Sequence, residues 1–454
     1  MLSLHTVRRL CAAIDALSIT VIAAVISKSR TKTDLAAYAN SPNHYQENLP
    51  TISACKAAIL KNRVNPKPES KQECPLSNDS DPKIVSEPAL LKIKAERDPE
   101  KLFLLFKSNA HNRLVVENRF AFEDTVSRLS GARRFDLIEH LLEHHKTLPQ
   151  GRREGFVVRI ITLYGRAGMP DHALRTFHEM HLFGCPRTVK SFNATLKVLS
   201  QANKFDDLWA VFYEAPSKYG IDLDEISYNT IIKVMCIMGG LDSAYCVMRE
   251  MEKVGLRPDV FTYTTLISAF YKHGRREIGD GLWNLMRLRG CLPSLTTFNV
   301  RIQYLISRRR AWQANTLVRN MYIYGIKPDE VTYNLIIKGF FMMGEFAMAK
   351  RIFYAMHGRG CKPNSRIYQT MVHYLCDGRE FDLAFSLCKD SMERNWFPNV
   401  DTISKVLKGL MTISKDRNAR EIMKLVSART PSFSTDEVKV FQDILSHRRT
   451  QKQH

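Results

Sequence analysis

A period of 35 residues is the feature of this sequence that most limits what the chain can fold into. Within residues 331–364, apolar residues recur twice at the i, i+3, i+4, i+7 spacing of an amphipathic helix, with Gly344 between the two runs and Gly360 and Pro363 after the second. The same pattern aligns without gaps in segments that start at Glu225, Val260, Leu295, Glu330 and Ser365. Each segment therefore predicts two helices joined by a turn.

The repeat extends in weaker form on both sides of these segments. The best-formed repeats are predicted at 189–224, 225–259, 260–294, 295–329, 330–364 and 365–399. The whole array is expected to cover 84–434, followed by a C-terminal helix and a basic tail at 435–454. Two short helices cannot bury their apolar faces alone, so we expect neighbouring repeats to stack into an all-α solenoid.

The N-terminal segment has the composition of a targeting sequence. Residues 1–40 are rich in Arg, Lys, Ser and Ala and contain only two acidic residues, Asp15 and Asp34. This favours an organelle transit peptide. A secretory signal or membrane anchor is the alternative, because Arg8 and Arg9 precede an apolar stretch. Residues 41–83 carry Pro, Ser, Asn and mixed charge without a period, which predicts a flexible linker.

The charge of the chain points to a polyanionic partner. The formal net charge is +21 and the pI is near 9.6. Nucleic acid is the first expectation and an anionic membrane the second, while a basic protein that only tolerates its charge is the alternative. The ten cysteines contain no CxxC pair, so neither a zinc ribbon nor a disulfide framework is expected.

No motif of catalysis or cofactor binding stands out. The sequence lacks HExxH, a Walker loop, GxGxxG and the H-x-E and P-C-x-x-C pair of base deaminases. His140, Glu143 and His144 share a helix face in residues 139–146, but a polar face in a degenerate repeat explains them better than a metal site. We therefore expect no enzymatic activity, no metal and no cofactor.

The repeat unit at 331–364 is similar to the pentatricopeptide repeat, and the constant 35-residue spacing resembles the P-type subclass found in plant organelles. The resemblance covers about three quarters of the chain. It implies a right-handed α-solenoid of 35-residue helix-turn-helix repeats that binds single-stranded RNA, with one nucleotide read by each repeat.

Two polar positions in each repeat are the candidates for reading RNA bases. The fifth position and the last position of a repeat hold short polar groups that can donate to and accept from a base edge. The resemblance implies that these groups read bases in the pairs Asn193 with Asp224, Asn229 with Asp259, Thr264 with Ser294, Asn299 with Asp329, Asn334 with Asn364, and Gln369 with Asn399. The alternative is that the last-position residues are simple helix N-caps.

Position nine of the repeat is a lysine in four repeats. It lies four residues after position five and therefore on the same helix face. It holds the candidate phosphate contacts Lys197, Lys233, Lys338 and Lys408. An ordinary solvated helix face is the alternative. Position two holds Ile226, Phe261, Thr296, Val331 and Arg366, and the resemblance implies that this residue wedges against bases.

The pairing rule that the resemblance implies gives a target sequence. Pairs of Asn with Asp imply uridine, Asn334 with Asn364 implies a pyrimidine, and Thr264 with Ser294 implies a purine. Gln369 with Asn399 matches no clear rule. The expected core target is 5′-U-U-R-U-Y-3′, and Asn229→Thr is expected to change one preference from uridine to guanosine.

These observations predict a monomeric binding protein for single-stranded organellar RNA that supports stabilisation, processing, splicing or translation without catalysis or membrane attachment. The alternative is a scaffold within a large ribonucleoprotein such as the mitochondrial ribosome or a splicing or processing complex. We expect a mitochondrial location, with the chloroplast as the alternative.

Overall fold

The computed structural model of this chain describes residues 88–451, with side chains as far as residue 446. The predicted transit peptide at 1–40 and linker at 41–83 lie outside the described residues. Within the described range the chain forms α-helices and two short 3-10 helices and no β-strand. It divides into an N-terminal unit that ends at Thr230 and a C-terminal unit that begins at Ile231, and the boundary falls inside helix α12 (Glu225–Ile237).

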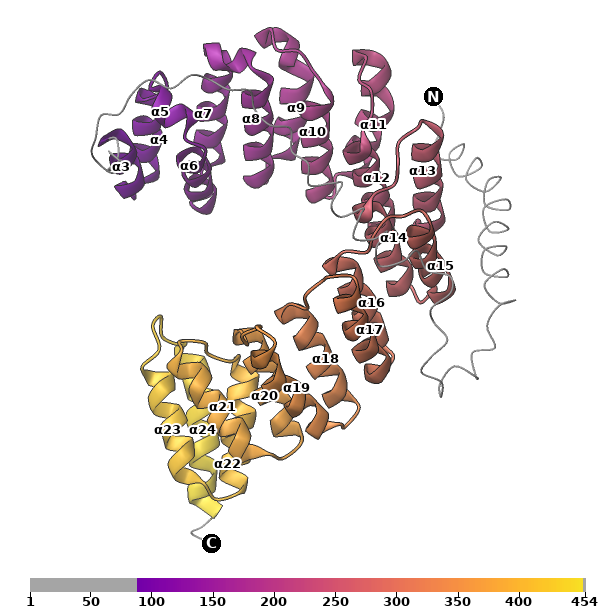
Figure 1. Ribbon diagram of the computed structural model, residues 1–454. Coiled ribbons are helices and arrows are strands. Elements are labelled where there is room, and N and C mark those ends of the chain that lie inside the picture. Colours follow the sequence, from indigo (N-terminus) through magenta and orange to yellow (C-terminus); the bar gives the residue numbers. More distant parts are fainter. Residues whose placement is uncertain (1–87, 452–454) are drawn as a thin grey trace, which may run out of the picture. The chain divides into compact units, whose positions relative to one another are not determined.

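The N-terminal unit contains the less regular repeats. Its helices are short and uneven, and two 3-10 turns interrupt them (Figure 1). They are α3 (Pro88–Ala95), α4 (Pro99–Ser108), α5 (Arg113–Glu117), α6 (Arg119–Gly131), α7 (Phe135–Thr147), η2 (Pro149–Arg152), α8 (Glu154–Arg166), α9 (Pro170–Glu179), η3 (Met180–Phe183), α10 (Val189–Gln201) and α11 (Phe205–Tyr219).

The C-terminal unit is a regular stack of helix pairs (Figure 1). In each pair, the first helix packs on its own second helix and on the first helix of the next repeat. The helices are α13 (Leu241–Lys253), α14 (Val260–Lys272), α15 (Arg276–Leu288), α16 (Leu295–Ser307), α17 (Ala311–Ile323), α18 (Glu330–Met342), α19 (Phe346–Gly358), α20 (Ser365–Asp377), α21 (Phe381–Glu393), α22 (Val400–Thr412), α23 (Asp416–Ser427) and α24 (Thr435–Gln451). This arrangement confirms the predicted all-α solenoid of 35-residue helix-turn-helix repeats.

The core of the C-terminal unit repeats with the same period. The residue at the fourth position of each repeat is buried; it is aromatic in four repeats and Ile403 in the last. The small residue of each second helix is also buried. Gly279 shows why that residue must be small, because an added Cβ would lie 2.5 Å from the ring of Tyr271. Close helix approach therefore depends on the small residues that recur in the sequence. Among residues 88–451, no helix combines the length and the apolarity that crossing a membrane requires.

The turn inside each repeat places one residue in the left-handed backbone region. The φ angles at this position lie between 55° and 81°, and the residues are Asn203, Gly239, Gly274, Arg309, Gly344, Arg379 and Ser414. Glycine adopts this conformation without steric cost, whereas the Cβ of other L-residues meets the neighbouring carbonyl oxygen. The arginines and the serine are therefore strained where several other repeats have glycine.

Replacing one of these arginines by glycine is expected to stabilise the chain. Arg309 is exposed and has a φ of 55°, so Arg309→Gly removes backbone strain without loss of packing. We expect a gain of about 1 kcal/mol in the free energy of unfolding, measured by denaturant titration. Arg310→Gly is the matched control, because Arg310 is also exposed but has a φ of −110°. A gain as large in the control would contradict the explanation by backbone strain.

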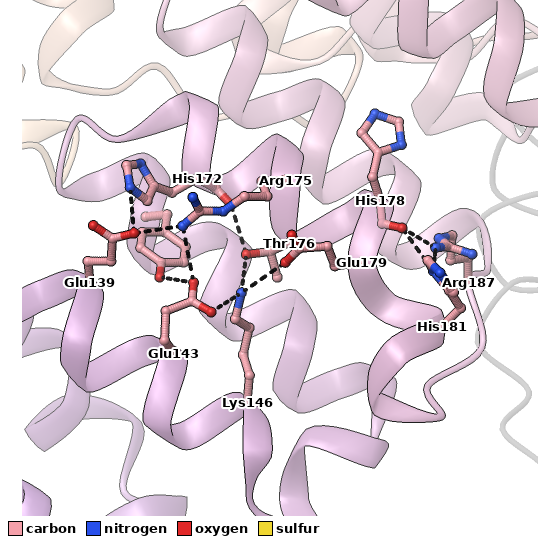
Figure 2. Close-up of polar contacts among 11 residues, drawn as sticks. Glu139, Glu143, Lys146, His172, Arg175, Thr176, His178, Glu179, His181 and Arg187 are labelled. Atoms are coloured by element: carbon pink, nitrogen blue, oxygen red, sulfur yellow. Dashed lines mark hydrogen bonds and ion pairs between the residues drawn. The ribbon is translucent and has the colours of Figure 1, made fainter.

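A buried lysine joins two helices of the N-terminal unit, α7 and α9. The Lys146 side chain is 0% exposed, and its ammonium lies 2.7 Å from Glu143 and 3.7 Å from Glu179. It also donates to the Thr176 hydroxyl at 3.2 Å. Figure 2 shows this lysine from α7 reaching the polar residues of α9, beside an ion pair between Glu139 and Arg175 at 2.7 Å. Polar contacts thus supply part of the cohesion of these degenerate repeats.

Glu143 contacts a tyrosine as well as Lys146. The Tyr164 hydroxyl donates to this carboxylate at 2.8 Å. Burial, together with the negative charge of Glu143, raises the pKa of Tyr164 well above its usual range. Glu143 is therefore tied to a tyrosine on α8 as well as to Lys146 on its own helix.

Candidate nucleic-acid interface

The last residue of a repeat caps the first helix of the next one. Its side-chain oxygen accepts a hydrogen bond from the backbone N–H of the third residue of that next repeat, at 2.8–3.2 Å. This contact is made by Asp224, Asp259, Ser294, Asp329, Asn364 and Asn399. The last-position residues are therefore helix N-caps, which was the alternative considered for them. This role accounts for the last position but not for the polar residue at position five.

Asn193 and Asp224 meet although they are 31 residues apart in the sequence. The Asn193 amide nitrogen donates to both carboxylate oxygens of Asp224, at 2.9 and 3.1 Å. The buried hydroxyl of Ser227 donates to the Asn193 amide oxygen at 2.7 Å and lies 2.9 Å from Asp224. Three side chains from two successive repeats thus form one half-buried cluster.

Asn299 and Asp329 repeat this arrangement in the C-terminal unit. Asn299 donates to Asp329 at 3.3 Å, and the Thr332 hydroxyl donates to the Asn299 amide oxygen at 2.6 Å. The same hydroxyl lies 2.7 Å from the Asp329 carboxylate. Burial acts to raise the pKa of Asp329, but the hydrogen bonds from Thr332 and Asn299 outweigh it and lower this pKa. The carboxylate is therefore held in its charged form.

Thr264 and Ser294 are linked through a hydroxyl in the same place. The Thr297 hydroxyl lies 2.7 Å from that of Thr264 and 3.0 Å from that of Ser294. The three oxygens form a chain of hydroxyl groups without a net charge. This repeat therefore presents a neutral polar surface where the repeats with Asp present a carboxylate.

Gln369 is bound by the protein at both ends of its amide. Its nitrogen donates to the Thr402 hydroxyl at 2.7 Å, and its oxygen accepts from the backbone N–H of Asn399 at 2.9 Å. The Asn399 side chain instead accepts from the Thr402 backbone at 3.0 Å. Much of the hydrogen-bonding capacity of Gln369 is therefore used within the protein, which fits its lack of a clear pairing rule.

Asn334 and Asn364 lack the linking hydroxyl, because position three of the next repeat is Ile367. Asn364 accepts from the Ile367 backbone N–H at 3.1 Å. The amide oxygen of Asn334 is buried and has no hydrogen-bond partner among the described residues. This pair is therefore less tightly organised than Asn299 with Asp329.

Asn229 and Asp259 fall on opposite sides of the boundary between the two units, so each is described by itself. Asn229 is 7% exposed in the N-terminal unit. Asp259 caps α14 in the C-terminal unit through a capping box with Thr262. Their function as a pair stays a prediction.

The third position of the repeat is the site residue that the sequence reasoning missed. Its hydroxyl is buried in every repeat that has one, and in four of the clusters above it touches the fifth position of the preceding repeat. The signal was present, since six of seven repeats have Ser or Thr there: Ser191, Ser227, Thr262, Thr297, Thr332 and Thr402.

The four lysines at position nine are exposed. The ion pairs recorded for residues 88–446 involve none of them, whereas lysines elsewhere, such as Lys350 and Lys389, are paired with glutamates. Each of the four lies one helical turn after position five on the same helix face. The residues are Lys197, Lys233, Lys338 and Lys408, and their charges are available to an anionic ligand.

Position two presents apolar side chains on the same helix face. Ile226, Phe261 and Val331 are 60%, 50% and 50% exposed. Thr296 and Arg366 are also exposed. The first helices that begin at Glu225, Val260, Leu295, Glu330 and Ser365 therefore expose the side chain at position two. The polar group at position five is half-buried in the last four of these helices and buried at Asn229. In four repeats an exposed lysine follows at position nine.

The histidines considered for metal binding have other surroundings. Glu143, between His140 and His144, is engaged by Tyr164 and Lys146. Burial lowers the pKa of His144. In the part of the chain that the structure describes, no three His, Cys, Asp or Glu side chains are placed to hold a metal ion.

The regular repeats match a known family. The family model of the pentatricopeptide repeat (PPR) matches residues 223–272, 258–307, 293–342 and 328–377. A second model of the same repeat matches residues 159–185. The matched segments contain most of the candidate reading pairs described above.

The chain is similar to proteins of the plant Arabidopsis thaliana. It is 65% identical over 176 residues to the Arabidopsis thaliana pentatricopeptide repeat-containing protein At1g80150, mitochondrial, covering 39% of this chain and 44% of that protein. It is 39% identical over 165 residues to the Arabidopsis small ribosomal subunit protein mS79 (rPPR3b), covering 36% of this chain and 42% of that protein. The chain thus matches less than half of the length of either relative.

Among solved structures, the crystal structure of the pentatricopeptide repeat protein PPR10 from maize is similar, with 18% identity and a TM-score of 0.47. The match covers 78% of this chain and 59% of that one.

Proposed function

We propose, from the premise that this chain belongs to the pentatricopeptide repeat family, that it binds single-stranded RNA with base selectivity and without catalysis. The observation that carries the proposal is the cluster that joins a fifth-position residue to the last residue of the same repeat, as in Asn193 with Asp224 and Asn299 with Asp329. These half-buried amides and carboxylates have the donors and acceptors that a Watson–Crick edge requires, and that edge is open only in a single strand.

The remaining residues of the first helices support the same proposal. Exposed apolar side chains at position two can lie against the face of a base. Lysines at position nine can neutralise the phosphate on the same helix face. We therefore assign base reading to positions five and last, and phosphate contact to position nine.

A mitochondrial site of action is part of the proposal. Four of the proteins that the chain resembles are mitochondrial PPR proteins by name. A basic segment such as residues 1–40 suits an organelle transit peptide, and residues 41–83 would then link it to the repeats. Such a protein could stabilise, process or support the splicing or translation of an organellar transcript.

A salt-titrated gel shift tests the proposal. The full chain is titrated into an RNA that carries UUAUU, and into the same RNA with these bases changed so that every position disagrees with the expected target. We expect at least a tenfold preference (about 1.4 kcal/mol) for the first RNA at ~150 mM salt. Equal binding that weakens steeply with salt would show phosphate contact alone and would overturn base reading.

A scaffold within a ribonucleoprotein is the second candidate, and a cleft on the second helices favours it. The cleft lies between α17 and α19, has a volume of about 240 Å³ and is lined by Trp312, Tyr322, Arg319, Arg351 and Arg359. The ion pairs recorded for residues 88–446 involve none of these arginines. Exposed Trp, Tyr and Arg side chains are typical of protein interfaces.

Similarity to ribosomal proteins agrees with that candidate. Three proteins that the chain resembles are ribosomal subunit proteins by name, mS79, mS78 and mL103. Sedimentation of the endogenous protein separates the two functions. A peak with the ribosome that survives RNase treatment of bound messenger RNA would favour the scaffold, whereas a small peak would favour the free RNA-binding protein.

A further inference from the structure

We propose that the cleft between α17 and α19 binds an acidic peptide segment of a partner protein and takes an apolar side chain of that segment between the two helices. Base reading is not involved, because second helices form the walls of the cleft, whereas the candidate reading residues belong to first helices and repeat ends. Such a segment would supply the scaffold candidate with a partner of defined chemistry.

The cleft has an apolar floor and aromatic side chains in its wall. The buried side chains of Val318 and Ile336 lie at the floor. Trp312 in the first turn of α17 is 49% exposed, and Tyr322 in the last turn is 45% exposed. Ten residues separate them, which is about 15 Å along the helix. A volume of about 240 Å³ is below the range of about 300–1,000 Å³ for small-molecule pockets and suits peptide side chains.

Three arginines give the rim of the cleft a positive charge. Arg319 comes from α17, Arg351 comes from α19, and Arg359 is the residue that follows α19. All three are exposed, and the ion pairs recorded for residues 88–446 involve none of them. The two helices supply no counter-charge, because α17 and α19 contain no Asp or Glu, whereas α13, α15, α21 and α23 each contain at least two.

The corresponding cleft one repeat earlier contains its own acid. It lies between α15 and α17 and has a volume of about 160 Å³. Its two arginines, Arg276 and Arg301, each lie 3.2 Å from the carboxylate of Asp280. Asp280 is at position 21 of its repeat, where the next repeat has Asn315. The cleft between α17 and α19 therefore has a neutral amide at the position from which a carboxylate neutralises its neighbour.

The composition of the cleft favours a protein over a nucleic acid. Interface cores between proteins are enriched in aromatic residues, Met and Arg and depleted in Lys. The described residues that line this cleft include Trp312, Tyr322, Met348 and the three arginines, and no lysine. A phosphate backbone could pair with the arginines but would leave the apolar floor unfilled. A segment with carboxylates beside a Leu or aromatic side chain satisfies both features, because Arg pairs with carboxylates in bidentate geometry.

The test starts from a phage-displayed library of random peptides of about 12 residues, long enough to follow the cleft as a helix. The full chain selects from the library, and the double variant Arg319→Glu with Arg351→Glu removes peptides that bind elsewhere. We expect the enriched peptides to carry two or more Asp or Glu beside a Leu, Phe or Trp. Enrichment of neutral or basic peptides, or of none that depends on the two arginines, would overturn the proposal.

Three variants then test the cleft with one selected peptide, whose affinity is measured by fluorescence anisotropy. Arg319→Glu with Arg351→Glu should lower the affinity at least about tenfold (about 1.4 kcal/mol). Trp312→Ala removes the aromatic wall and should lower it by a similar factor. Asn315→Asp places a carboxylate four residues before Arg319 on the same helix face, and should lower the affinity about twofold to threefold.

The matched control changes the same number of charges on another second helix. Arg417 and Arg420 are exposed on α23. Arg417→Glu with Arg420→Glu should leave the peptide affinity within about twofold. A charge-swapped peptide, with Arg in place of its acidic residues, should bind the Arg319→Glu with Arg351→Glu variant more tightly than the wild-type chain. An equal loss in the α23 control, or no such reversal, would contradict recognition by the cleft. Circular dichroism and thermal unfolding verify that each variant is folded.

The same variants decide between a peptide and other occupants of the cleft. The Arg319→Glu with Arg351→Glu variant should lose no more affinity for the UUAUU RNA than the α23 control. A larger loss would make the cleft an RNA contact, and a wild-type dimer that this variant cannot form in sedimentation equilibrium would assign the cleft to a second copy; either result would overturn the proposal. Equal wild-type binding to UUAUU and to the mismatched RNA would overturn the base-reading function and leave the peptide site intact.

Discussion

Replacing Lys197, Lys233, Lys338 and Lys408 with glutamine is expected to lower the affinity for single-stranded RNA several hundredfold at ~0.1 M salt. Each lysine that neutralises a phosphate contributes about 0.7 to the slope of log K against log salt for a single strand. Four contacts therefore contribute about 2.8 to this slope. The variant should bind with a flatter salt dependence by about that amount, as measured by fluorescence anisotropy over a range of salt concentrations.

The control removes the same number of charges from lysines that are already paired. Lys204, Lys253, Lys350 and Lys415 form ion pairs with Asp171, Glu250, Glu380 and Asp382. Their replacement by glutamine lowers the formal charge equally but removes no phosphate contact. We expect a change in slope below about 1. An equal loss of affinity in the two variants would mean that net charge alone attracts the RNA, and the assignment of position nine would be wrong.

The base preference of the position-nine variant should persist, because phosphate contacts set affinity while base contacts set selectivity. The ratio between UUAUU and its mismatched counterpart is therefore the second measurement on the same protein. A loss of that ratio would show that the lysines also position the reading amides.

The repeat architecture was predictable from the sequence because it depends on local signals. The apolar period, the terminal proline and the small residue of the second helix each act within one repeat, so the helix pairs at 260–294 and 330–364 could be placed by residue. The polar residues at the repeat ends could be recognised as helix caps for the same reason.

The details of the candidate site depend on contacts between repeats, which no local signal contains. Thr332 could be recognised as the partner of a helix cap, but its contact with Asn299, 33 residues earlier, follows from the stacking of two repeats. The residues in the left-handed backbone region were also only partly predictable from the sequence. Gly344 indicates such a turn by itself, whereas Arg309 occupies the same conformation without any compositional sign.

The buried lysine of the N-terminal unit was missed for a third reason. In residues 119–153 the repeat is degenerate, and Lys146 lies in a run of polar residues that reads as a solvated face. Its burial follows from the packing of α9 over α7, where Glu179 and Thr176 reach it across the helix pair. A polar network takes the place of the apolar contacts that regular repeats use.

Disrupting this network is expected to have the largest effect on stability of any single substitution considered for the N-terminal unit. Glu143→Gln leaves the Lys146 ammonium fully buried, with a hydroxyl at 3.2 Å and a carboxylate no closer than 3.7 Å. An inadequately compensated buried charge is strongly destabilising, and we expect a loss of about 3 kcal/mol in the free energy of unfolding. Denaturant unfolding measures the loss, and hydrogen exchange should locate it in α7 and α9.

A double-mutant cycle then separates charge from packing. Lys146→Met keeps an unbranched side chain of similar length in the buried site and removes the ammonium. Added to Glu143→Gln, it should recover about 2 kcal/mol, because the buried charge is no longer present. Glu117→Gln, which breaks an exposed ion pair with Arg113 in the same unit, should leave the stability unchanged. If the two substitutions at 143 and 146 were simply additive, Lys146 would stabilise the unit through the packing of its side chain alone, and the electrostatic explanation would be wrong.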